Sequence, residues 1–204
     1  MGRAGQAENH GMRRAVFLDR DGVLNRSSTR AGRPVAPVSL EEFELLPGVI
    51  EAIRALHEAG FYLCVVTNQP DVGAGKVRRE VVEEMHQKLR EWLPIDDIQV
   101  CYHVEADGCD CRKPKPGMLL ASAKAASIDL KESFMVGDLW RDVSAGKAAG
   151  CKTMFVDYGY EEAGPDKSDF IVASLLEAAR ILLHFEPNRL NQRPGQDASH
   201  EIAS

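Results

Sequence analysis

The sequence lacks the features that would assign it to a membrane, an export pathway or nucleic acid. In its 204 residues, no apolar run reaches the roughly 18 residues needed to cross a bilayer. The first 14 residues contain no apolar stretch of the kind found in a secretory signal. The formal net charge is −6, and no basic stripe runs along any segment. We therefore expect a cytoplasmic protein with no membrane or nucleic-acid partner.

Cysteine is also scarce, with five residues in the whole chain. In the cytoplasm these are expected to be thiols or metal ligands rather than disulfides. No internal repeat or low-complexity linker interrupts residues 14–186, which predicts a single domain. Residues 1–13 and 187–204 are polar and have few apolar anchors, and we expect them to be disordered tails.

Short apolar segments alternate with helical periods along the domain. The expected strands are 15–18, 61–66, 98–102, 134–136 and 153–156. Continuous apolar runs of this length are typical of strands buried on both faces, as in parallel sheets. The expected helices begin at Pro47, near Val81, and at Pro116, Trp140 and Ser174. This alternation predicts an α/β fold with a doubly wound, Rossmann-like parallel sheet, in which ligands bind beyond the carboxyl ends of the strands.

The first expected strand ends in Asp19-Arg20-Asp21-Gly22. A carboxylate at the end of a buried strand is partly desolvated and needs a partner, and Mg²⁺ takes oxygen ligands together with substrate phosphate. Asp19 would then attack phosphorus, while Asp21 would protonate the leaving oxygen and later take a proton from water. The motif alone leaves two alternatives open: a solvated turn, or the metal-holding pair of a sugar-nucleotide transferase.

Two further strands also end in polar residues. Thr67 and the backbone N–H groups of Asn68 and Gln69 can donate to phosphoryl oxygens. Asp138 suits a metal, and Asp142, one helical turn later, would hold either Lys113 or a metal-bound water. The alternatives are an ordinary turn after the second strand and a helix N-cap at Asp138.

A loop with two prolines, residues 111–117, carries Arg112 and Lys113. Lys113 can offset charge on Asp19 and on a transferring phosphoryl group, and Arg112 can fork onto a second phosphate or a carboxylate. A solvated basic loop is the alternative.

Four metal-ligand side chains lie within eleven residues: Cys101, His103, Cys109 and Cys111. Three thiolates and one imidazole form a closed tetrahedral zinc site, which leaves no position for a substrate. We therefore expect structural Zn²⁺ that staples the loop leading into Arg112 and Lys113. Free cysteines in a loop are the alternative.

The order of these motifs and their places at strand ends resemble the haloacid-dehalogenase (HAD) superfamily of aspartyl phosphatases, over about residues 14–183. The resemblance implies a phosphatase without a large cap domain. It implies Asp19 as nucleophile, Asp21 as acid/base, Thr67 and Lys113 as phosphoryl stabilisers, and Asp19, Asp21 and Asp138 as magnesium ligands.

The zinc loop and the stretches 17–25, 65–76 and 109–120 look like a subgroup that holds heptose-bisphosphate phosphatases and the histidinol-phosphatase domain. This resemblance implies a monomer that removes the 7-phosphate of a phosphorylated sugar, D-glycero-D-manno-heptose 1,7-bisphosphate. The implied substrate-binding residues are Ser27, Ser28, Thr29, Arg30, Asn68, Gln69, Pro70 and Arg112. Two departures concern specificity: Leu139 stands where such phosphatases often have Lys, and residues 27–39 form a longer loop.

Three other functions remain as alternatives. A histidinol-phosphate phosphatase would share the chemistry and would want an acidic wall, which Glu41, Glu42 and Glu44 could supply. A catalytically silent, zinc-stapled binding module would keep the fold but lose an acid. A phosphatase for nucleic-acid ends is disfavoured by the charge of −6 and the missing basic groove.

Overall fold

The computed structural model describes residues 12–30, 32–161, 164–165 and 167–184. The expected tails 1–13 and 187–204 lie outside these residues except for Met12 and Arg13. The backbone N–H of Arg13 donates to the carbonyl of Ser127 at 2.9 Å, and Arg13 forms a parallel bridge with Ile128. The backbone of Arg13, which the sequence analysis assigned to the tail, is therefore hydrogen-bonded to the loop after α4.

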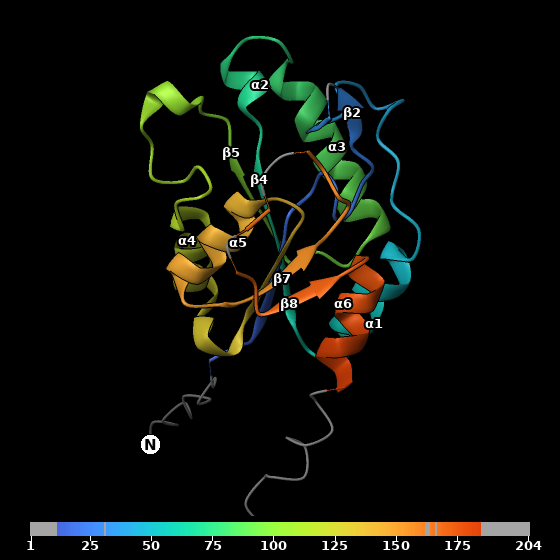
Figure 1. Cartoon of the computed structure of the whole chain (residues 1–204), viewed down its shortest axis with the longest axis vertical. Coiled ribbons are helices and arrows are strands. Elements are labelled where there is room, and N and C mark those ends of the chain that lie inside the picture. The colour runs from blue at the N-terminus through green and yellow to red at the C-terminus, as the bar shows by residue number, and fades with distance from the viewer. Residues whose placement is uncertain (1–11, 31, 162–163, 166, 185–204) are drawn as a thin grey trace, which may run out of the picture.

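A six-stranded parallel sheet forms the centre of the molecule, in the order β5-β4-β1-β6-β7-β8 (Figure 1). Its strands are β1 Ala15–Leu18, β4 Tyr62–Asn68, β5 Asp97–Cys101, β6 Phe134–Gly137, β7 Lys152–Val156 and β8 Phe170–Val172. The five expected strands are confirmed. All four residues of β1 are buried, as expected of a central strand covered on both faces.

Helices cover both faces of this sheet (Figure 1). They are α1 Val49–Glu58, α2 Pro70–Gly73, α3 Arg79–Trp92, α4 Gly117–Ala126, α5 Trp140–Ala149 and α6 Leu175–His184, with short 3₁₀ turns at Glu105–Asp107 and Leu130–Glu132. One buried cluster joins the sheet to α1, α3 and α6, and a second joins it to α4 and α5. This is the doubly wound α/β architecture expected from the sequence.

The expected helices begin and end close to their predicted signals. The hydroxyl of Ser174 accepts a hydrogen bond from the backbone N–H of Glu177 at 3.2 Å, which confirms it as a helix cap. Gly150 ends α5 with φ +90°, a conformation that a side chain would disfavour.

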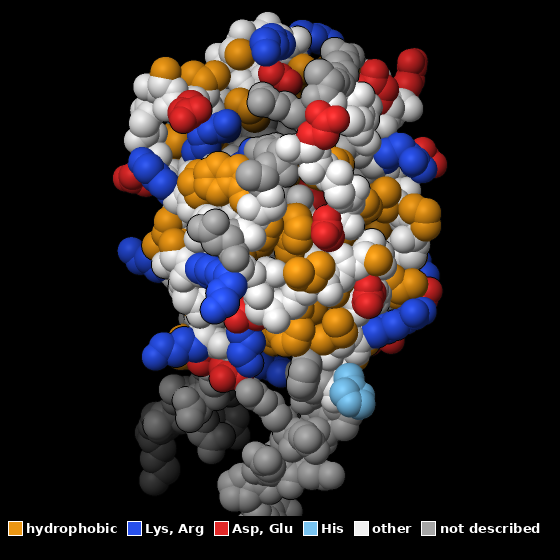
Figure 2. All heavy atoms as spheres, viewed as in Figure 1, with side chains coloured by type: hydrophobic (Ala, Val, Ile, Leu, Met, Phe, Trp, Pro, Cys, Tyr) orange, Lys and Arg blue, Asp and Glu red, His pale blue; other side chains and the backbone are white. Residues whose placement is uncertain are grey.

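The segment after the first motif forms an antiparallel hairpin of β2 Ser28–Arg30 and β3 Arg33–Val35. Among the described residues, this hairpin and the loop that carries the cysteines are the additions to the sheet and its helices, so a large cap domain is absent from that part of the chain. No helix in the same part is long and apolar enough to cross a membrane. On the face seen in Figure 2, acidic and basic side chains are interspersed rather than gathered by sign.

Three strand ends meet at one edge of the sheet. β1 is hydrogen-bonded to both β4 and β6, so the residues that follow these strands become neighbours. Asp19 follows β1, Asp138 follows β6, and Thr67 and Asn68 end β4. The polar motifs therefore lie where a doubly wound sheet places its ligand site.

Candidate active site

Three buried carboxylates and one ammonium form the centre of this edge. One carboxylate oxygen from each of Asp19, Asp138 and Asp142 lies within 4.8 Å of the other two. The ammonium nitrogen of Lys113 lies 2.7 Å from Asp19 Oδ1 and 2.6 Å from Asp142 Oδ1, and its side chain is 2% exposed. Of the two partners foreseen for Asp142, the structure shows Lys113.

The electrostatics of this cluster favour an additional cation. Burial raises the pKa of Asp19 to about 6, against the opposing influence of Lys113. Burial and the neighbouring carboxylates also raise the pKa of Asp138 well above its usual range. Lys113 keeps a raised pKa because its two carboxylate partners outweigh its burial. Asp138 is 1% exposed, and the Tyr160 hydroxyl and Lys113 only partly oppose the rise in its pKa. A hard divalent ion with oxygen ligands fits this donor set.

Asn68 connects the end of β4 to the Lys113 loop. Its side-chain amide donates to the carbonyl of Lys113 at 3.0 Å, and its Oδ1 accepts from the backbone N–H of Lys113 at 3.1 Å. This paired contact fixes the backbone from which the Lys113 ammonium reaches Asp19.

The carboxylate of Asp21, which the resemblance placed among the magnesium ligands, is not one of the three that lie within 4.8 Å of one another. Both of its oxygens accept hydrogen bonds from Arg20, at 3.0 to 3.1 Å. The amides of Asn25 and Gln69 donate to it at 2.9 Å and 2.7 Å. The side chain of Asp21 is thus held by three residues, Arg20, Asn25 and Gln69, and its role as a magnesium ligand stays a prediction.

A cavity of about 220 Å³ opens over Asp19. It is lined by Asp19, Asp21, Ser27, Asn68, Pro70, Asp71, Arg112, Lys113, Leu139, Arg141, Asp142 and residues 34–36. Of the expected substrate-binding residues, Ser27, Asn68, Pro70 and Arg112 therefore face the cavity.

The other expected substrate residues lie elsewhere. Gln69 is 4% exposed, and its amide donates to Asp21 and to the hydroxyl of Thr67, so it supports the site from within. Ser28 and Thr29 are exposed on β2 and do not line the cavity. The side chain of Arg30 lies outside the described parts of the chain.

The sequence analysis missed two polar residues in the cavity wall. Asp71 lies in α2, a four-residue helix that no periodicity announces. Arg141 lies between Asp138 and Asp142, at the start of α5. The first turn of a helix beginning beyond a site-bearing strand was the signal that could have found Arg141.

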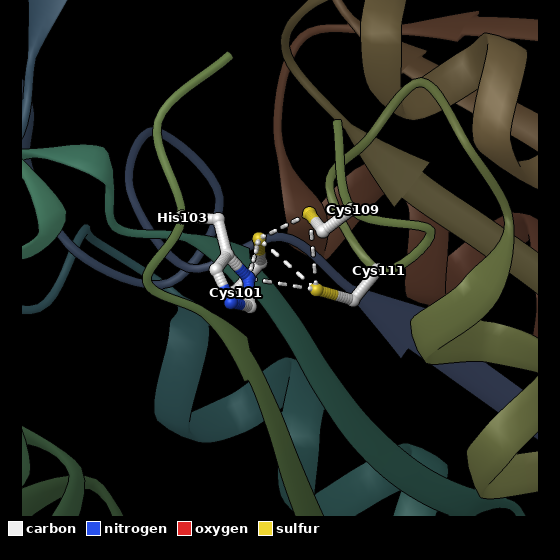
Figure 3. Close-up of side chains that lie close together, drawn as sticks. All are labelled: Cys101, His103, Cys109 and Cys111. Carbon is white, nitrogen blue, oxygen red and sulfur yellow. Dashed lines mark hydrogen bonds between the residues drawn. The ribbon is translucent and has the colours of Figure 1, made fainter. Parts of the chain in front are cut away.

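A second cluster of metal-ligand side chains lies at the end of β5 and in the loop that follows it (Figure 3). The sulfur atoms of Cys101, Cys109 and Cys111 are 3.3 to 3.7 Å apart, and His103 Nδ1 lies 3.3 Å from Cys111 Sγ and 3.6 Å from Cys101 Sγ. Zinc–sulfur bonds of about 2.3 Å in a tetrahedron place sulfur atoms about 3.8 Å apart. The four side chains converge on one point, as a zinc site requires. Cys64 and Cys151 are buried and are not part of this cluster.

Comparison with known proteins agrees with this geometry. Residues 29–150 match the family model of haloacid dehalogenase-like hydrolases. The D-glycero-beta-D-manno-heptose-1,7-bisphosphate 7-phosphatase of Pasteurella multocida (strain Pm70) is 35% identical, over 84% of this chain and 97% of that protein. The enzyme of the same name from Escherichia coli (strain K12) is 32% identical, over 89% of this chain and 97% of its own length.

A solved structure shows the same likeness. The D,D-heptose 1,7-bisphosphate phosphatase of B. bronchiseptica, complexed with magnesium and phosphate, has a TM-score of 0.70 and 31% identity, over 84% of this chain and 99% of that one. The fold, the acidic cluster with its lysine and these relatives agree. The chain belongs to the haloacid dehalogenase-like hydrolases and is a phosphatase of that family.

Proposed function

We propose that this phosphatase removes the 7-phosphate of D-glycero-D-manno-heptose 1,7-bisphosphate through a covalent aspartyl phosphate at Asp19. The observation that carries the proposal is the Asp19 carboxylate, which lines the cavity and is paired with the buried ammonium of Lys113. The substrate class is supported by two relatives that are named for this activity and that match this chain over nearly their whole length.

The first half of the reaction transfers the phosphoryl group to the protein. A carboxylate oxygen of Asp19 attacks phosphorus, and the bond from phosphorus to the sugar oxygen breaks. Lys113 and the hydroxyl of Thr67 stabilise charge on the transferring group. Asp21, at the cavity wall, gives its proton to the departing sugar oxygen. When bound by Asp19 and Asp138, Mg²⁺ supplies positive charge that lets an anionic nucleophile approach an anionic phosphate.

The second half regenerates Asp19. Asp21, now ionised, takes a proton from water, and the water oxygen attacks phosphorus and releases Asp19 and inorganic phosphate. Arg112 is suited to the second phosphate of the substrate because it lines the cavity and is tethered at 3.3 Å to the carbonyl of His103. Arg141 provides a further cation in the same wall.

Phosphate release in Mg²⁺-containing buffer tests the substrate. The panel is the heptose 1,7-bisphosphate, histidinol phosphate, and sugar mono- and bisphosphates. We expect the highest kcat/KM with the heptose bisphosphate. A higher kcat/KM with another member of the panel would overturn the substrate while leaving the family intact.

The histidinol-phosphate alternative receives no support from its expected acidic wall. Glu41, Glu42 and Glu44 do not line the cavity. Glu42 accepts a hydrogen bond from the backbone N–H of Val38, and Glu44 forms an exposed ion pair with Arg26.

We also propose that the Cys101–Cys111 cluster holds a structural Zn²⁺. Replacing one of four ligands should release the metal, so Cys109→Ser is expected to lose bound zinc and to loosen the loop that carries Arg112. Cys151→Ser, which changes a buried cysteine outside the cluster, is the matched control. Equal zinc content in the two purified variants would contradict the assignment.

We also propose that the protein is a monomer, so light scattering is expected to give a mass of 22.5 kDa.

A further inference from the structure

Arg20 is a buried charge beside the cavity that the chemistry above does not use. Its side chain is fully buried, and its guanidinium packs 5.6 Å from the centre of the Phe43 ring. Nε and Nη2 donate to the carboxylate of Asp21, and Nη1 lies 3.2 Å from Nε2 of His86. His86 comes from α3 and lies 66 residues from Arg20 in the chain, so one guanidinium links Asp21 to that helix.

The partners of His86 determine its hydrogen-bonding form. A guanidinium can only donate, so His86 Nε2 must accept, and its proton must lie on Nδ1. Nδ1 faces Glu83 Oε2 at 3.4 Å, and the other oxygen of Glu83 accepts from the Tyr102 hydroxyl at 2.7 Å. Burial and the adjacent Arg20 lower the pKa of His86 to about 4. His86 is therefore a neutral acceptor at neutral pH.

We propose that His86 is a positioning residue that, by holding Arg20 in place, sets the orientation of the Asp21 carboxyl group, which gives its proton to the leaving group and is then ionised. The inference rests on the proposed function, in which Asp21 is the acid/base. Without the acceptor at position 86, Nη1 would be buried and unsatisfied, and the guanidinium would turn to find another partner. The fork that holds both oxygens of Asp21 would then be lost, leaving the neutral amides of Asn25 and Gln69.

A comparison of two leaving groups isolates this role. A sugar alkoxide must be protonated as it leaves, whereas para-nitrophenolate leaves without a proton. The value of kcat/KM reports the reaction only up to departure of the leaving group. The quantity to measure is therefore the ratio of kcat/KM for the heptose bisphosphate to kcat/KM for para-nitrophenyl phosphate. The concentration of active enzyme cancels in this ratio, so partial unfolding does not change it.

Asp21→Asn calibrates the measurement and tests the proposed function separately. Removing a general acid should lower the ratio by about 100-fold. If Asp21→Asn leaves the ratio unchanged, the proposed role of Asp21 fails, and the inference about His86 fails with it. If Asp21→Asn lowers the ratio and the His86 variants do not, only the inference fails.

His86→Leu is expected to lower the ratio by about tenfold, because small displacements of catalytic groups cost up to about 100-fold. His86→Gln retains an acceptor for Arg20 and is expected to stay within about threefold of the wild type. Glu83→Ala removes the half-exposed carboxylate that faces His86 Nδ1, and it should lower the ratio in the same direction. A ratio unchanged in His86→Leu and Glu83→Ala, or lowered as much in His86→Gln as in His86→Leu, would overturn the proposal.

Discussion

Lys113 balances the charge of the acidic cluster. Its ammonium contacts Asp19 and Asp142, while Asp138 lies within the same group of buried carboxylates. An ammonium with two close carboxylate partners retains its proton despite burial, which agrees with its raised pKa. The same residue therefore offsets the charge of two buried carboxylates and lines the cavity.

Lys113→Met should abolish turnover and destabilise the fold. Breaking a buried ion pair by removing one partner costs about 3–5 kcal/mol, because the remaining charges lose their compensation. Lys124→Met, which removes an exposed lysine of α4, is the control and should leave both properties near those of the wild type. Urea unfolding and phosphate release measure the two effects. Equal stability of the two variants would contradict the balancing role of Lys113.

For single residues, the sequence predicts which ones gather at the site better than it predicts where their side chains point. Asp19, Asp138 and Lys113 were expected to meet, because strand ends and the loop before a helix converge on one edge. The inward turn of Gln69 and the link from Arg20 to His86 could not be foreseen. No local pattern predicts a fully buried arginine. The side chains of Arg20 and Gln69 are oriented by hydrogen bonds to residues that are distant in the sequence.

Among the elements, the turn after β1 depends on a glycine. Gly22 has φ +91°, and a Cβ built on it would lie 2.0 Å from Asp138 Oδ2. A side chain at this position would therefore strain the backbone and also push Asp138 out of the acidic cluster.

Gly22→Ala should lose activity and raise the Mg²⁺ concentration needed for half-maximal rate, in addition to losing about 1–2 kcal/mol of stability through backbone strain. Gly60→Ala is the matched control, since Gly60 has φ +83° and nothing lies within 4 Å of a Cβ there. It should show the strain but keep its activity. If both variants remain equally active, the close approach of Gly22 to Asp138 has no functional role.

The elements that the sequence analysis did not predict are short or polar. β8 has three residues, and its middle residue, Ile171, is 68% exposed, so no buried run marks it. The hairpin of β2 and β3 has three residues on each side, too few for a hydrophobic pattern to predict it. The longer helices were predictable because their apolar faces repeat with the helical period.

For the molecule as a whole, the sequence predicted the layers of the fold but not the order of the strands. Strand–helix alternation requires helices on a parallel sheet. It does not say that β1 lies between β4 and β6, which is the arrangement that brings Asp19 and Asp138 together. That order depends on packing across the whole domain.

The raised pKa of Asp19, about 6 against 3.8, makes the stability of the Mg²⁺-free protein depend on pH. A carboxyl group whose pKa is raised by folding stabilises the fold below about pH 4, and this contribution is lost as the pH rises through about 6. Asp19→Asn removes this dependence on pH, because asparagine has no group that ionises there. The variant should therefore gain stability relative to the wild type as the pH increases from 4 to 7.

Thermal unfolding without Mg²⁺ at several pH values measures this difference. A change of 1 kcal/mol shifts the Tm of a chain this long by about 2–4 °C, which is readily detected. Adding Mg²⁺ at pH 7 should raise the Tm of the wild type more than that of Asp19→Asn, because the ion binds the folded carboxylates. If the Tm of Asp19→Asn instead increased relative to that of the wild type as the pH falls, Asp19 would not be the group responsible.

The central claim is that the phosphoryl group passes through Asp19. Turnover of the heptose bisphosphate, quenched in acid and reduced with borohydride, converts an aspartyl phosphate into homoserine, which peptide mass spectrometry locates. We predict homoserine at position 19 in the wild type and none in Asp19→Asn. Homoserine at another aspartate, or full turnover with none at position 19, would contradict the account.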